Sequence, residues 1–265
     1  MGSGRGIWAE HGLSYWLERG GKHVIFDTGA SGDVLLHNAP RLGVDLSAAD
    51  AIVLSHGHLD HVGGLEKLLP IAPEAPLFTH PDAQRPKFTG RPGNMHRSDT
   101  PFFVEGRFED GKRLVVKIRS PVEVIPGVWM SGEVPRTNNI EDSGGPFFQD
   151  AALTNPDPLP DDQALYVPTE NGTAVILGCA HAGIINTLDH VRGLTNGAPI
   201  RCVIGGTHLE NASAERMEWT IAALKRLGVK EIHPCHCTGM VNAVKLCEAT
   251  GGNSAPACAG FKYAW

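Results

Sequence analysis

The second half of the chain alternates apolar runs with amphipathic segments, which predicts strands followed by helices. In residues 213–228, Met217, Ile221 and Leu224 fall on one helical face, with Ser213 as N-cap and Gly228 as C-terminal stop. Alternation of this kind is the βαβ pattern of an α/β fold, a sheet covered by helices. The predicted strands are residues 173–181, 201–209 and 230–237, and the predicted helices are residues 183–194, 213–228 and 238–252.

The first half of the chain contains shorter apolar runs, broken by glycine and proline. Two alternating runs on either side of Gly20-Gly21 predict a strand pair, and the solid apolar run 49–58 predicts a buried strand followed by a short helix at 62–70. The polar, basic and proline-rich stretch 80–99 predicts a long loop or lid. Short strands are expected again at 114–120, 122–125 and 128–133. We therefore expect a single domain, residues 1–265, with a lid or insertion at about 80–120.

The composition is that of an ordinary globular protein, 42% apolar and 20% charged, with a net charge of −6. This mild acidity argues against nucleic acid as a partner, because phosphate binding requires clustered Lys and Arg. No apolar run of 18 residues suggests a membrane span. Six cysteines, mostly C-terminal, are too few for a disulfide scaffold, so we expect a cytoplasmic protein.

The strongest chemical signal is a cluster of histidines and an aspartate directly after the strand predicted at 49–58. His56, His58, Asp60 and His61 fall within six residues, followed by Gly63-Gly64. Imidazole binds zinc, iron and similar ions, and a carboxylate suits harder ions. Four ligands from six residues rarely close around one ion, so the spacing favours two adjacent metals.

Three later predicted strands also end in histidine, at His181, His208 and His236. Open α/β sheets place their sites at the carboxyl ends of strands, so these histidines are expected in one cleft. His208 is interpreted as a substrate contact or proton donor rather than a ligand, although a purely structural role stays open. His233, in contrast, belongs to no motif.

These motifs resemble the metallo-β-lactamase fold superfamily. The likeness rests on the H-x-H-x-D-H-x-G-G stretch, on "HVIFDTG" before it, and on "GCAHAGIIN", "GGTHLE" and "HCTG" after it. The later stretches are similar to the branch that includes an archaeal dihydropterin–ribofuranosylaminobenzene-phosphate synthase and many metal-dependent hydrolases. The resemblance runs from about Ala9 to Gly239. It implies a four-layer αββα sandwich, with the edge strand before Ala9 shortened or missing.

The resemblance also implies a dinuclear metal site. His56 and His58 would bind the first metal, Asp60 and His61 the second, and His236 would complete the second site. The ions would be two divalent metals, with zinc expected first and iron, manganese or magnesium as alternatives.

The chain departs from the family pattern at Gly178-Cys179, where Gly-Asp is usual. His181 is expected to supply the remaining histidine of the first metal. Cys179 is a tentative ligand in the bridging position, or else a small buried residue that leaves the bridge to solvent. Glu10 and His11 are weaker candidates for contacts outside the metal ligands.

The expected function is that of a hydrolase that uses a metal-bound hydroxide on an ester, lactone, amide or phosphoester, with Asp60 orienting the nucleophile. An alternative is a transferase that releases pyrophosphate from a pterin diphosphate. A third is a metal-binding or sensor protein without catalysis. Arg136 and the basic lid predict a small anionic substrate. A homodimer is left open.

Overall fold

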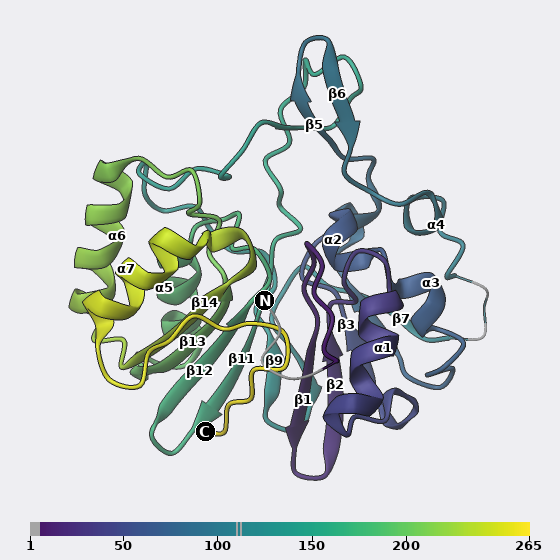
Figure 1. The fold of residues 1–265 in the computed structure, drawn as a ribbon, viewed down its shortest axis with the longest axis horizontal. Coiled ribbons are helices and arrows are strands. Elements are labelled where there is room, and N and C mark those ends of the chain that lie inside the picture. The colour runs from purple at the N-terminus through teal and green to yellow at the C-terminus, as the bar shows by residue number, and fades with distance from the viewer. Residues whose placement is uncertain (1–5, 110, 112) are drawn as a thin grey trace. The chain divides into compact units, whose positions relative to one another are not determined.

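The computed structural model describes residues 6–109, 111 and 113–265 (Figure 1). Contacts divide the chain into two compact units. The first unit comprises the chain up to Arg119, Val124–Pro126 and Gly145–Asp161, and the second comprises Ser120–Glu123, Gly127–Gly144 and Asp162–Trp265. The single-domain boundaries stay a prediction.

The first unit contains a five-stranded sheet in the order β1-β2-β3-β4-β7. β1 and β2 are antiparallel and are joined through Gly20 and Gly21, which both have positive φ, and the other neighbours are parallel. This confirms the predicted strand pair and the buried strand after it. The strands are β1 (Tyr15–Arg19), β2 (Lys22–Phe26), β3 (Ala51–Val53), β4 (Leu77–Thr79) and β7 (Val115–Lys117).

Helices pack against this sheet through an apolar core that includes Ile25, Ile52, Leu65 and Leu77. The predicted short helix is α3. α1 was not predicted, because Pro40 interrupts a short segment that lies between two left-handed glycines. The helices are α1 (Asp33–Leu42), η1 (Leu46–Ala48), α2 (Leu59–Val62), α3 (Leu65–Leu68), η2 (Pro81–Gln84) and α4 (Pro101–Val104).

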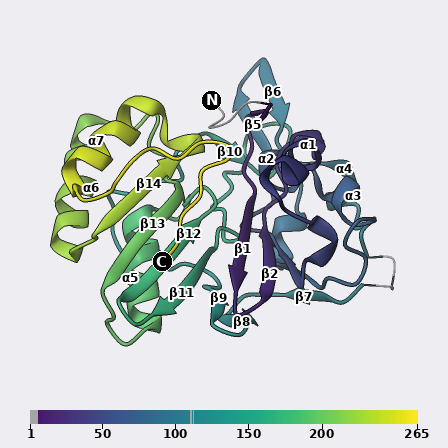
Figure 2. The ribbon, with the colours of Figure 1, turned by 60° about the horizontal axis from the view of Figure 1, so that its bottom comes forward.

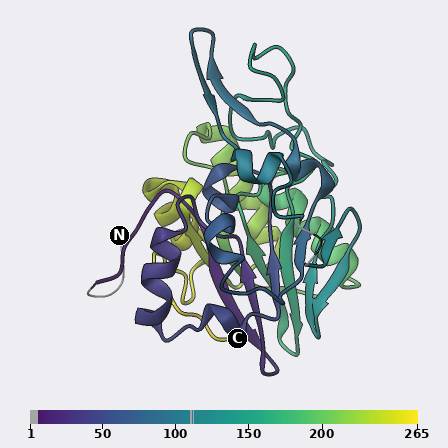
Figure 3. The ribbon, with the colours of Figure 1, turned by 90° about the vertical axis from the view of Figure 1, so that its right-hand side faces the viewer.

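The stretch expected to be a long loop contains a hairpin instead. β5 (Phe88–Arg91) pairs with β6 (Asn94–Arg97), and β10 (Phe147–Phe148) adds a third strand on the other side of β5. Pro92-Gly93 makes the connection, with Gly93 at φ 84°, a turn that proline and glycine favour. The hairpin extends outward from the rest of the first unit (Figure 3).

A six-stranded sheet in the order β14-β13-β12-β11-β9-β8 (Figure 2) belongs to the second unit, except for Val124 and Ile125 of β8, which are assigned to the first. β12, β13 and β14 are parallel, and β11 is antiparallel to both of its neighbours. The strands are β8 (Val122–Ile125), β9 (Val128–Met130), β11 (Ala164–Thr169), β12 (Gly172–Leu177), β13 (Ile200–Gly206) and β14 (Glu231–Cys235).

Three helices cover this sheet: α5 (Ile184–Leu194), α6 (Ala214–Leu227) and α7 (Met240–Thr250). Ser213 caps α6, because its hydroxyl accepts a hydrogen bond from the Arg216 amide, and Gly228 ends α6 in the left-handed conformation. Met217 and Leu224 are buried against the sheet and Ile221 packs beside them. The predicted α/β class and the βαβ order are confirmed.

Among the helices that the structure describes, none combines the length and the apolar character that crossing a bilayer requires. All six cysteines are free thiols.

Candidate metal centre

In the first unit, the loop after β3 directs two buried histidines toward each other. Nε2 of His56 lies 3.0 Å from Nδ1 of His58, and the two rings are nearly perpendicular at 83°. Ser55 contacts the other nitrogen of His56 at 2.9 Å. Two imidazole nitrogens that converge in this way from residues i and i+2 are suited to one shared ion.

His61 and Asp60 form the second converging pair of this loop. The Asp27 carboxylate lies 2.7 Å from Nδ1 of His61, which leaves Nε2 to face Asp60 Oδ2 at 3.7 Å. A carboxylate on the far nitrogen of a histidine is the usual means by which proteins orient a metal ligand. His11 Nε2 lies 3.3 Å from the same Asp60 oxygen, so the expected outer contact of His11 is present.

Asp27 connects the two pairs, and this role was missed in the sequence. Its carboxylate accepts hydrogen bonds from the Ser55 amide and hydroxyl, both at 2.7 Å, besides its contact with His61. Asp27 itself has φ 62°, a left-handed conformation that costs free energy unless contacts hold it. The signal in the sequence was an aspartate closing a strand, but nothing local named His61 as its partner.

A buried group of three charged side chains holds the loop that carries His56 and His58. Asp161 accepts a hydrogen bond from the Gly57 amide at 2.8 Å, and Lys87 Nζ lies 3.0 Å from Asp161 and 3.1 Å from Asp157. Burial acts to lower the pKa of Lys87, but the charges of Asp161 and Asp157 outweigh it and leave the pKa raised. Lys87 is therefore a buried structural cation and not one of the surface cations predicted for the lid.

Burial, with help from the Lys87 charge, lowers the pKa of His58 to about 3. The ring is accordingly neutral near pH 7, which is the form that ligates metals. Gly57 between the histidines has no room for a side chain, because a Cβ there would meet the Ala83 carbonyl.

In the second unit, Cys179, His181 and His208 come together at the ends of β12 and β13. One ligand atom of each lies within 4.8 Å of the others, and the two imidazole rings are 4.4 Å apart. The Ser143 carbonyl lies 2.8 Å from Nδ1 of His181 and so orients that ring. Metal binding by Cys179 stays a prediction, and so does the role of His208 as a substrate contact or proton donor.

His236 follows β14, at the start of the short helix η3 (His236–Thr238), and is half-buried. It has φ 52°, and Ala180 and His208 have φ 53° and 49° at the neighbouring strand ends. Residues other than glycine rarely take this conformation, and it concentrates where side chains serve function. Cys237 is buried and its sulfur accepts a hydrogen bond from the His208 amide, which supports that turn.

Arg136 is exposed, and its guanidinium donates a hydrogen bond to the His181 carbonyl at 2.8 Å. The same loop is held by Glu141, which accepts hydrogen bonds from the Ile185 and Asn186 amides at the start of α5. Arg136 therefore braces the segment that carries His181, and its predicted substrate contact stays a prediction.

Each unit thus supplies a group of ligand-type side chains with oriented rings. The first unit brings together His56, His58, Asp60 and His61, and the second brings together Cys179, His181 and His208, with His236 at the next strand end. Imidazole, carboxylate and thiolate together match the ligands that zinc and related divalent ions take in proteins.

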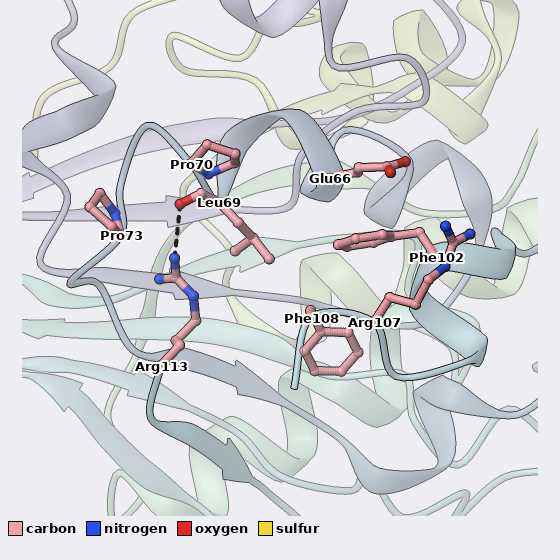
Figure 4. A pocket seen from close by; sticks show the side chains of 8 residues that line it. All are labelled: Glu66, Leu69, Pro70, Pro73, Phe102, Arg107, Phe108 and Arg113. Atoms are coloured by element: carbon pink, nitrogen blue, oxygen red, sulfur yellow. Dashed lines mark hydrogen bonds between the residues drawn. The ribbon is translucent and has the colours of Figure 1, made fainter. Parts of the chain in front are cut away.

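A separate cavity of about 350 Å³ lies in the first unit (Figure 4). The Phe102 and Phe108 rings and the Arg107 and Arg113 guanidinium groups line it together with apolar residues of the α3 region. None of the predicted metal ligands lines this cavity.

The chain is similar to proteins of one family. A family model described as the metallo-beta-lactamase superfamily matches residues 7–236. The 7,8-dihydropterin-6-methyl-4-(beta-D-ribofuranosyl)-aminobenzene-5'-phosphate synthase of Methanocaldococcus jannaschii is 33% identical over 243 residues, 88% of this chain and 82% of the synthase. An uncharacterized protein of the same organism is 29% identical over 249 residues, 91% of this chain and 89% of that protein.

The fold also has a close match among solved structures. The crystal structure of a metal-dependent hydrolase of the beta-lactamase superfamily superposes with a TM-score of 0.79 at 28% identity, and the match covers 98% of this chain and 93% of the other.

Proposed function

Because the chain belongs to the metallo-β-lactamase superfamily and is an enzyme of that superfamily, we propose that it is a hydrolase with a dinuclear metal centre. The substrate class is an ester, lactone, amide or phosphoester, and the molecule is small and anionic. The expected ions are two zinc ions, and the expected location is the cytoplasm.

The observation that carries this proposal is the pairing of ligands in the loop after β3. His56 and His58 direct nitrogens at one point, 3.0 Å apart, and His61 faces Asp60 with its other nitrogen fixed by Asp27. In a histidine-rich surface turn the rings would be exposed, whereas the rings of His56, His58 and His61 are buried. Two converging pairs are what two adjacent ions need.

We assign His56, His58 and His181 to the first ion and Asp60, His61 and His236 to the second, with Cys179 as a further ligand in the bridging position. Family membership supports the combination of ligands from the two units. Divalent ions in such a centre activate water at neutral pH and polarise the group under attack.

The chain's own residues take the remaining roles. Asp60 accepts a hydrogen bond from the attacking water and orients it. His208 is half-buried beside His181 and can donate a proton to the leaving group. Arg136 is exposed next to the His181 loop, so its charge is available to a phosphate or carboxylate on the substrate.

The transferase alternative has one specific observation in its favour, the 33% identity to a synthase over 82% of that protein's length. In this chain the corresponding reaction would transfer a pterin group from a diphosphate to an aminobenzene acceptor, with release of pyrophosphate. The same anion-binding role of Arg136 would serve the diphosphate.

Metal analysis of the purified protein, followed by assays on lactone, phosphodiester and β-lactam panels, tests the hydrolase. A parallel assay for pyrophosphate release from a pterin diphosphate with an aminobenzene acceptor tests the transferase. The expected result is about two metals per chain and turnover in the first set. Fewer than about one metal per chain contradicts the dinuclear centre, and pyrophosphate release alone replaces the hydrolase with the transferase.

Variants assign the roles. His208→Gln is expected to lower kcat about 10²-fold with little change in metal content, as loss of a general acid does. His37→Gln is the matched control, because His37 stacks on Trp8 and contacts the Gly6 carbonyl, outside the site. Loss of metal in His208→Gln would make His208 a ligand instead of a proton donor.

A further inference from the structure

A second group of ligand-type side chains lies in the second unit, outside the residues assigned above. Cys202, Glu231 and His233 are 0%, 6% and 3% exposed, and one ligand atom of each lies within 4.8 Å of the other two. Nothing in the proposed hydrolytic centre uses them.

The sheet places these three side chains on one face. Cys202 of β13 pairs with Glu231 of β14 in parallel register, and His233 follows two residues later on the same strand. Val203, which follows Cys202, and Ile232, which lies between Glu231 and His233, belong to the apolar core shared with the helices. Since side chains alternate along a strand, Cys202, Glu231 and His233 lie on the face that the helices do not cover.

The C-terminal segment covers this face. After α7 the chain runs back along β14 (Figure 1), where the Ile232 amide donates to the Ser254 hydroxyl and the Ala257 amide donates to the Pro234 carbonyl, both at 3.0 Å. The Tyr263 hydroxyl then reaches Glu231 and donates a hydrogen bond to its carboxylate at 2.6 Å.

His233 is the group that this packing leaves incompletely satisfied. Its Nδ1 lies 3.1 Å from the Ala255 carbonyl, and its ring packs against Phe261 and Tyr263 at 4.8 and 5.0 Å. Its Nε2 is buried and has no hydrogen-bond partner within the part of the chain that the structure describes. A buried ring nitrogen without a partner is costly, and a cation bound at Nε2 would remove that cost.

We propose that Cys202, Glu231 and His233 form a separate structural site for one zinc-like divalent cation, bound by the thiolate, one carboxylate oxygen and Nε2. This ligand set is one that zinc takes in proteins. The Nδ1 contact to Ala255 would persist, and a histidine ligand commonly keeps such a carbonyl partner. The Tyr263 hydroxyl, 2.6 Å from the Glu231 carboxylate, could serve as a fourth ligand or keep its hydrogen bond to Glu231.

The charge balance of the site is consistent with metal binding. Cys202 is a buried free cysteine, and its sulfur must give up the thiol proton to bind a cation. Cation binding displaces that proton to solvent, and the bound ion then carries one thiolate and one carboxylate. The Arg201 guanidinium, 3.3 Å from the other Glu231 oxygen, stays in place as a partly buried ion pair.

Cobalt(II) is the probe, because a thiolate bound to cobalt gives an intense near-ultraviolet charge-transfer band. The full-length protein carrying Cys179→Ser is loaded with cobalt, so that Cys179 cannot contribute. We expect the band, and its loss together with one metal per chain when Cys202→Ser or His233→Gln is added. Cys247→Ser is the matched control, because Cys247 is another buried thiol of this unit and lies outside the ligand group.

A second measurement uses the wild-type protein, so it tests the proposed site even if one of the variants fails to fold. Zinc is expected to slow proteolysis within residues 251–265 in the wild-type chain, because the cation fastens the covering segment to β14. An absent charge-transfer band in the Cys179→Ser protein, or tail proteolysis that zinc leaves unchanged, overturns the proposal. The proteolysis experiment leaves every proposed ligand of the hydrolytic centre intact, because it uses the wild-type chain.

Discussion

At the scale of single residues, Asp27 shows how a neighbouring carboxylate orients a metal ligand, in this case His61. The carboxylate holds Nδ1 of His61 at 2.7 Å and also binds the Ser55 amide and hydroxyl. One side chain therefore fixes both the ring of a proposed ligand and the end of the strand that leads to the histidines.

Asp27→Asn is expected to weaken metal binding about 10- to 100-fold while the fold is kept, as loss of an outer carboxylate usually does. Asparagine has the same shape and tolerates the left-handed conformation of this position. Competition with a chromophoric chelator measures the affinity. An unchanged affinity in Asp27→Asn would show that Asp27 serves only the backbone of Ser55.

A second residue-scale prediction concerns acid stability at Asp50. The Lys22 ammonium, 2.7 Å away, and the His23 amide hold the pKa of Asp50 below its usual value. A carboxyl group with a lowered folded pKa stabilises the protein above its unfolded pKa of about 3.9, and that contribution is lost as pH falls through the folded pKa.

Asp50→Asn should therefore cost at most about 1 kcal/mol of unfolding free energy near pH 7, because the pair is close to solvent. The difference between variant and wild type should shrink as pH falls below about 4. Urea unfolding at a series of pH values measures it, and a difference that is constant with pH contradicts the assignment.

At the residue scale the sequence was informative wherever chemistry is local. His56, His58, Asp60 and His61 fall within six residues, and their spacing alone favoured two adjacent metals. Lys87 and Asp161 are 74 residues apart, so no pattern could show that a lysine in a basic stretch is buried against an aspartate. The group of Cys202, Glu231 and His233 was missed for the same reason. These residues come together only through the pairing of β13 with β14 and through the C-terminal segment that covers them.

Elements were predictable to the extent that their periodicity was strong. The alternating strands and helices from β12 to α7 were predicted because their apolar runs are long and helices such as α6 carry clear caps, here Ser213 and Gly228. The strand β11 (Ala164–Thr169) before them was not predicted. The β5–β6 hairpin was missed because its strands are polar and mostly exposed, so no apolar alternation marks them. Only Pro92-Gly93 signalled its turn.

The start of this hairpin depends on the buried cluster around Lys87. The Lys87 ammonium neutralises Asp157 and Asp161, and Asp161 in turn holds the Gly57 amide between the two histidines. Lys87→Met should cost about 3–5 kcal/mol of unfolding free energy, because it leaves two buried carboxylates without a cation. Urea unfolding measures this loss, and metal affinity should fall with it.

Arg85→Met is the matched control for Lys87→Met. The Arg85 side chain is largely exposed, and its partner Asp82 also pairs with Arg119, so the loss of Arg85 should change the unfolding free energy by less than about 1 kcal/mol. Equal effects of the two substitutions would mean that burial of the Lys87 cluster contributes nothing beyond surface charge.

At the scale of the whole molecule, the division into two compact units gives the proposed metal centre a thermodynamic consequence. Ligands are assigned from both units: His58 and His61 from the first, His181 and His236 from the second. An ion bound by both units stabilises only the state in which both are folded, by about 4 kcal/mol at a thousandfold excess over its dissociation constant.

Calorimetry should therefore show two separable unfolding transitions in chelator-treated protein and a single transition at higher temperature after zinc is restored. In His58→Ala, zinc should no longer merge the transitions, because the first unit has lost a ligand. It should still raise the transition of the second unit through Cys202, Glu231 and His233. If zinc raises each transition separately in the wild-type chain, each unit binds its own metal, and the shared dinuclear centre is wrong.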